Sequence, residues 1–411
     1  MPFLSLLDDR AKPKGSRDPL GFELIWTHYG RQVIGNLTTI TGSLNNFAVA
    51  LLGFKWANDL HADALEAEQQ TRIRDAFLRY EQLAAYLRYL SKDKQIMGIT
   101  RVQQRMADKQ SSIVFGVGSD AQILSDQASY GLWGLYSSAM RDTGLVQGNN
   151  RTPTQRGLEI AKLIEDRLEQ SRFIDVFSSE EPVDIETLEA LASTFKKMIN
   201  TKDAREKLLH SLMDGSPNKT LQHELWSLTQ KMADENETVD GISGFIAQIK
   251  KRCGGSKLMH RLEEIERVER LLVAANNIFN YCRRKDGETA DDLVSTLEQK
   301  RYNYGHLPDT INFHGLQRAD LLKRLLHALK SDKHGEAVKT LLELNKEVMK
   351  LRGGCPWVEL ENDSTLRVRV PSETATLLNQ DEIESNWDYD YFIASYINVV
   401  SQERKLSWTT R

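Results

Sequence analysis

Apolar residues recur every three to four positions through most of the chain, which is the spacing of one face of an α-helix. The clearest apolar stripe predicts an amphipathic helix over 62–90, with arginines on its other faces. A second stripe predicts a longer helix over 257–284, whose outer face carries charges of both signs. The same spacing predicts shorter helices over 184–200, 204–213, 221–232 and 242–251.

Three segments depart from this pattern. Residues 47–56 (FAVALLGFKW) are almost wholly apolar but too few to cross a bilayer, so we expect a buried core helix. Residues 357–360 and 366–370 alternate apolar and charged side chains on the two sides of a polar turn, which predicts a β-hairpin. An aromatic final helix is expected over 387–402. The pattern therefore predicts a mainly α, multi-helical fold with a small C-terminal β-hairpin module.

The chain has 411 residues, more than a single hydrophobic core usually organises. The polar run SSEEP at 178–182 marks a boundary near the middle. We therefore expect four segments: an apolar helical entry segment over 1–61, a second region over 62–175, a helical domain over 180–300, and helices with the hairpin over 301–411.

Charge and cysteine content narrow the classes of protein. A net charge of -4 argues against a broadly basic nucleic-acid coat, although a local basic face remains possible. Cys253, Cys282 and Cys355 are odd in number and widely spaced, so they predict reduced thiols and not a disulfide framework. The N-terminus lacks the basic-then-apolar order of a signal peptide. These features favour a cytoplasmic protein without a membrane partner.

The stretch 129–160 carries the most specific local signal. It predicts a helix over 130–141, a glycine stop at Gly144, a short polar loop and a second helix. Glycine tolerates the left-handed conformation that ends many helices. Thr152 can cap the second helix, and Pro153 is acceptable in its first turn.

Residues 151–157 (RTPTQRG) resemble the wing-to-helix junction of the MarR/PadR-like winged helix-turn-helix regulators. About 30 residues carry the resemblance, which implies a winged-helix-like N-terminal half. It also implies a recognition helix over 130–141 followed by a wing, an arrangement that usually contacts double-stranded DNA.

Three interpretations of this region remain open: DNA contact, docking of a partner protein, or ordinary helical packing. The helix over 130–141 is aromatic and carries one basic residue, whereas DNA-reading helices supply several polar or basic side chains. A further basic group surrounds the Gly254–Gly255 turn, where an anion could bind, although charge at helix ends explains it as well. The candidate nucleic-acid-binding residues are Arg141, Arg151, Arg156, Lys250, Lys251, Arg252, Lys257 and Arg261, and the candidate partner-binding residues are Trp133, Tyr136, Trp387 and Tyr391.

Motifs for catalysis are sparse, and we expect no catalytic residue, cofactor or metal. His306 and His314 flank Asp309 in a loop, but isolated loop histidines are far commoner than metal ligands. The acidic residues of the hairpin would suit a metal-dependent nuclease, yet no lysine follows two residues after either acid on the strand. Charges that protect an exposed strand edge are the alternative explanation. The acids concerned are Glu359, Glu361 and Asp363.

The blocks GLWGLY and GGCPWVEL…WDYDYFIASY are similar to uncharacterised accessory proteins of bacterial defence or restriction loci. The sequence thus predicts a non-enzymatic accessory component that associates with DNA and partner proteins in antiviral defence. A protein-interaction scaffold without nucleic-acid binding and a metal-dependent nuclease are the alternatives.

Overall fold

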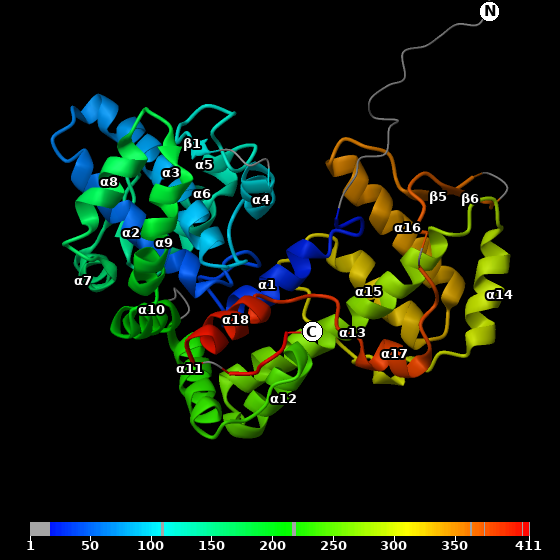
Figure 1. Ribbon diagram of the computed structural model, residues 1–411. Coiled ribbons are helices and arrows are strands. Elements are labelled where there is room, and N and C mark those ends of the chain that lie inside the picture. The colour runs from blue at the N-terminus through cyan, green and yellow to red at the C-terminus, as the bar shows by residue number, and fades with distance from the viewer. Residues whose placement is uncertain are drawn as a thin grey trace, which may run out of the picture. The chain divides into compact units, whose positions relative to one another are not determined.

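The computed structural model describes residues 17–107, 111–215, 219–361, 364–373, 375–404 and 406–410, and it is mainly helical (Figure 1). The chain forms two compact units, each made of separate stretches of sequence. Unit 1 comprises the residues up to Gln32 together with Cys253–Tyr391, and unit 2 comprises Val33–Arg252 with the residues from Phe392 onward. The four segments expected from the sequence are each continuous. The two units are not, because residues distant in sequence share a core, and no boundary between the units coincides with a boundary of the expected segments.

Unit 2 is organised around the apolar helix α2 (Leu44–Leu60), which is buried over most of its length. Its central part is the expected core helix. The amphipathic helix α3 (Glu66–Leu90) packs along it. Gly53 makes this approach possible, because a Cβ there would lie 2.3 Å from the Tyr80 ring. No helix among the described residues combines the length and apolar character that a bilayer crossing requires.

Other helices of unit 2 pack around α2 and α3. In Figure 1, α9 lies close to α2, α3 and α6. A two-residue strand, β1 (Ser112–Ile113), pairs antiparallel with β4 (Val183–Asp184). The remaining helices that lie wholly or almost wholly in this unit are α4 (Ile99–Ala107), α5 (Gln127–Tyr130), α6 (Leu132–Asp142), α7 (Gln155–Ile164), α8 (Gln170–Ser178), α9 (Ile185–Ile199), α10 (Lys202–Asp214), α11 (Lys219–Asp234), α12 (Gly241–Cys253) and α18 (Ile393–Arg404).

The final helix begins later than the aromatic pattern predicts. Tyr391 and Phe392 have φ angles of 48° and 63°, which lie in the left-handed region. A right-handed helix cannot pass through these values, so α18 starts at Ile393.

Unit 1 contains the long helix α13 (Lys257–Cys282), whose buried face carries the apolar stripe read from the sequence. Its hairpin is confirmed: β5 (Val358–Leu360) pairs antiparallel with β6 (Leu366–Val368), and Val358 faces Val368. The other elements are α1 (Glu23–Val33), which ends one residue beyond the unit, α14 (Ala290–Lys300), the 3-10 turn η2 (Tyr304–His306), α15 (Ala319–Lys330), α16 (His334–Leu351) and α17 (Gln380–Ser385).

Candidate nucleic-acid interface

Helix α6 ends in a glycine motif, as the sequence predicts. Gly144 has a φ of +67°, and its N–H donates to the Arg141 carbonyl at 2.9 Å. The next N–H, from Leu145, donates to the Met140 carbonyl at 2.8 Å. These two bonds satisfy carbonyls at the helix end and turn the chain sharply into the following strand.

A short two-stranded hairpin follows α6 where the sequence predicts a wing, and the name wing is kept for it. Strands β2 (Val146–Gln147) and β3 (Thr152–Pro153) pair antiparallel, with Gln147 opposite Thr152. The sequence predicts Thr152 as the cap of α7, and this is wrong. The cap is Thr154, whose side chain accepts from the Gly157 N–H at 3.2 Å. Pairing with Gln147 keeps Thr152 in the strand, and Pro153 lies in β3 instead of in the first turn of the helix.

Two contacts join the residues on either side of the wing. The Thr154 hydroxyl donates to the Gly144 carbonyl at 2.7 Å, which joins the start of α7 to the end of α6. A Cβ at Gly157 would lie 2.1 Å from the Leu145 carbonyl oxygen, so only glycine allows this approach. The end of α6 and the start of α7 are thus fixed beside each other at the base of the wing.

Two arginine side chains, Arg141 and Arg151, lie near each other at this wing. The Arg151 guanidinium lies 4.2 Å above the centre of the Trp133 ring. Burial, followed by the nearby Arg141, lowers the pKa of Arg151. The Arg151 Nε is buried without a hydrogen-bond partner, while Arg141 and Arg156 are exposed. Within the described residues, none of the three forms an ion pair with a carboxylate, so their charge is uncompensated locally.

The aromatic face of α6 points into unit 2. Trp133 is 5% exposed and packs against the rings of Phe54 and Phe77. Tyr136 is fully buried, and its hydroxyl accepts from the Asn46 side chain at 2.9 Å. A partner could not reach these rings without displacing α6, so they serve the core of their own unit.

The C-terminal pair of candidate partner residues lies in unit 1. Tyr391 is fully buried, and its hydroxyl donates to the Glu269 carboxylate at 2.7 Å. Trp387 is half-buried, and its ring lies 5.9 Å from that of Tyr391. Of the four aromatic residues predicted to bind a partner, Trp387 alone retains appreciable exposure.

The second basic group is partly neutralised by its own neighbours. Arg252 pairs with Glu235 at 2.9 Å and also with Glu237. Arg261 pairs with Glu264 on the same helix. Lys251 and Lys257 are exposed and Lys250 is half-buried. Lys250, Lys251 and Arg252 belong to unit 2, whereas Lys257 and Arg261 belong to unit 1. Arg252 and Arg261 therefore have carboxylate partners, which the described residues do not show for Arg141, Arg151 or Arg156.

The acids of the hairpin face arginines across the strands. Glu359 pairs with Arg369, and Glu361 pairs with Arg367 at 3.3 Å. Asp363 lies outside the described residues. This arrangement favours surface charge pairs on the hairpin over a metal-dependent nuclease site.

Two residues of the loop that contains the histidines also contact neighbouring groups. Asp309 pairs with Lys330, and the His306 Nδ1 lies 3.0 Å from the Asn303 carbonyl oxygen. His314 is exposed. In the part of the chain that the structure describes, no three histidine, cysteine, aspartate or glutamate side chains gather to hold a metal ion.

A buried carboxyl that the sequence did not single out positions α6. Glu81 on α3 is 2% exposed and accepts from the Leu132 N–H, the first of α6, at 2.6 Å. The Gln127 side chain donates to its second oxygen at 2.9 Å. Burial raises the pKa of Glu81 to about 7. A glutamate within an apolar stripe is a weak indication of a buried carboxyl group, because the spacing of apolar residues does not distinguish a buried glutamate from a solvent-exposed one.

The chain matches no protein-family model, and it is similar to no curated protein and to no solved structure.

Proposed function

We propose that unit 2 binds the phosphate backbone of double-stranded DNA through Arg141, Arg151 and Arg156, and that the protein acts as a non-enzymatic, DNA-associated accessory component. One observation carries this proposal: the guanidinium of Arg151 is held over the Trp133 ring beside Arg141, and neither pairs with a carboxylate among the described residues.

Neighbouring like charges repel, and a bound anion relieves that repulsion. A phosphate accepts hydrogen bonds from guanidinium groups in a planar, often bidentate geometry. Stacking on Trp133 restricts the Arg151 guanidinium before any ligand binds, which reduces the entropy lost on binding.

The side chains of α6 favour binding that is independent of base sequence. Its aromatic residues are buried, and the exposed positions near its end include Ser138 and Arg141. Phosphate contacts position a protein on DNA, whereas base edges in the grooves supply sequence information. We therefore expect the wing to bind unrelated duplexes with similar affinity.

Fluorescence anisotropy with a labelled duplex tests this proposal. The logarithm of the association constant should fall linearly with the logarithm of the salt concentration, by roughly 0.9 for each phosphate neutralised. R141A and R156A should each reduce that slope by about 1 and weaken binding to unrelated duplexes equally. R151K keeps the charge but loses the planar stacking group, so it should weaken binding while preserving most of the slope.

R172A is the matched control, because Arg172 is an exposed arginine of the same unit that pairs with Glu169. It should bind duplex as the wild-type protein does. The absence of binding at low salt, or equal binding by wild type, R141A and R156A, would overturn the proposal.

Partner proteins and a place in antiviral defence stay predictions from the sequence blocks. Three of the four aromatic residues that would anchor a partner in the scaffold alternative are buried.

A further inference from the structure

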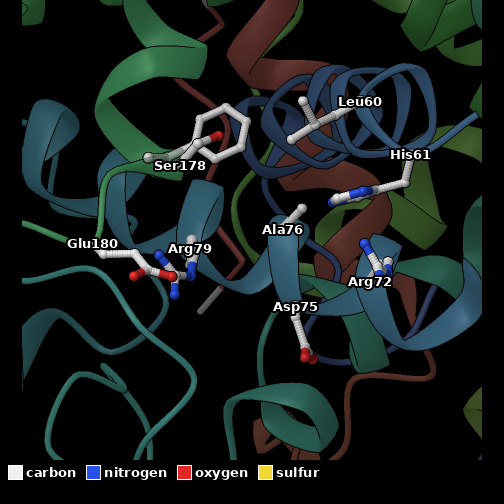
Figure 2. A pocket seen from close by; sticks show the side chains of 9 residues that line it. Leu60, His61, Arg72, Asp75, Ala76, Arg79, Ser178 and Glu180 are labelled. Carbon is white, nitrogen blue, oxygen red and sulfur yellow. The ribbon is translucent and has the colours of Figure 1, made fainter. Parts of the chain in front are cut away.

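A hollow of about 250 Å³ opens on unit 2, remote in sequence from the wing. It lies between the end of α2, the first half of α3 and the end of α8, and Figure 2 shows the side chains around it. Its apolar wall comes from Leu60, Ala76 and Phe177. Phe177 is fully buried, whereas Leu60 is 40% exposed, so an apolar side chain remains open to solvent at the rim. Such a surface favours an apolar group in the hollow.

Two of the charged residues that line the hollow are engaged by neighbours on α3. Asp75 accepts from Arg74 at 2.9 Å, and Figure 2 shows its carboxylate directed away from Ala76. Arg72 donates to Glu68 at 2.7 Å. These residues therefore contribute little uncompensated charge.

Arg79 and Glu180 form the other charged side of the hollow. Arg79 donates one N–H to the Ser179 carbonyl at 3.1 Å, which fixes the guanidinium but leaves other donors available. Glu180 is exposed and forms no ion pair with any described residue. In Figure 2 the guanidinium and the carboxylate lie on the same side of the hollow. They present one cation and one anion that are not paired with each other.

His61 lines the opposite side. Burial, followed by the nearby Arg72, lowers the pKa of His61, so the imidazole is neutral at neutral pH. The hollow consequently lacks an excess of positive charge and is poorly suited to a simple anion.

We propose that this hollow binds a free α-amino acid with an apolar side chain. The carboxylate of the ligand would accept from Arg79, its ammonium group would donate to Glu180, and its side chain would pack on Leu60, Ala76 and Phe177. The two charges of a zwitterion match the two unpaired charges of the site, and its apolar group matches the wall. This inference is independent of the proposed binding of DNA.

Isothermal titration calorimetry of the full-length protein with L-leucine tests the inference. Two analogues separate the contributions: 4-methylpentanoate lacks the ammonium group, and leucinamide lacks the carboxylate. We expect L-leucine to bind and each analogue to bind at least about tenfold more weakly, which corresponds to about 1.4 kcal/mol. No binding of L-leucine, or equal binding of all three compounds, would overturn the assignment.

Matched variants connect that binding to this site. E180Q removes one charge from an exposed side chain without any described ion pair and should weaken L-leucine binding about tenfold. E181Q changes the exposed neighbour that does not line the hollow and should bind as wild type does. Unchanged affinity in E180Q, or the same loss in E181Q, would show that the hollow does not select a zwitterion.

Discussion

Replacing Glu81 with glutamine should remove much of the pH dependence of the stability of unit 2. The Glu81 side chain is 2% exposed, and it accepts hydrogen bonds from the Leu132 N–H and the Gln127 amide. Both donors are neutral groups, so no cation offsets the loss of hydration when the carboxyl ionises. Burial consequently raises its pKa from 4.5 to about 7.

The size and direction of the effect follow from this difference in pKa. At 1.36 kcal/mol for each pKa unit, the shift from 4.5 to about 7 corresponds to about 3 kcal/mol. The folded state binds the proton more tightly than the unfolded state. The stabilisation is therefore fully present below the unfolded pKa and is lost as the pH rises through the folded pKa.

Urea denaturation of wild type and E81Q between pH 5 and pH 8, followed by far-UV circular dichroism, measures the effect. The wild-type protein should lose roughly 2.5 kcal/mol more than E81Q over this range. Glu269 in unit 1, whose pKa burial raises to about 8, contributes in the same direction to both proteins and cancels in the difference.

E189Q is the matched control, because Glu189 is an exposed residue of α9 in the same unit. It should follow the wild-type pH profile. Parallel profiles for wild type and E81Q, or a wild-type unit that gains stability relative to E81Q as the pH rises, would refute the explanation by burial.

Two further predictions concern packing in unit 2. Lys55 and Glu165 form a buried ion pair at 2.8 Å, so K55M alone should cost about 3–5 kcal/mol in denaturant unfolding, whereas K55M/E165Q should cost clearly less. Equal losses would contradict a penalty from the unpaired charge. G157A places a Cβ 2.1 Å from the Leu145 carbonyl oxygen and should lower the unfolding free energy by about 1–3 kcal/mol, whereas G244A, in open space on α12, should raise it by roughly 0.5–1 kcal/mol. Thermal unfolding distinguishes these opposite signs, and a shift in the same direction would refute the steric explanation.

Local signals were sufficient for several elements. The almost wholly apolar run 47–56 predicts a buried helix because such a surface cannot remain hydrated at low cost. Alternation on both sides of a polar turn predicts the β5–β6 hairpin, and Gly144 predicts the end of α6, since each depends on neighbouring residues alone.

Local sequence patterns gave the wrong residue where two nearby residues could each form the same feature. Thr152 and Thr154 can both cap a helix, and only the pairing of Thr152 with Gln147 decides between them. The late start of α18 depends on the left-handed backbone at Tyr391 and Phe392, which an aromatic pattern does not indicate.

The sequence by itself determined that the protein is mainly helical, that its C-terminal part carries a hairpin, and that arginines occur around a glycine-ended helix. Those properties depend on periodicity and on turn residues, which act over a few positions. Tertiary structure decided that Trp133 and Tyr136 are buried, that Arg252 and Arg261 are paired, and that Arg151 lies over Trp133 beside Arg141. Burial and charge compensation depend on which distant segments meet, and that information is not contained in local spacing.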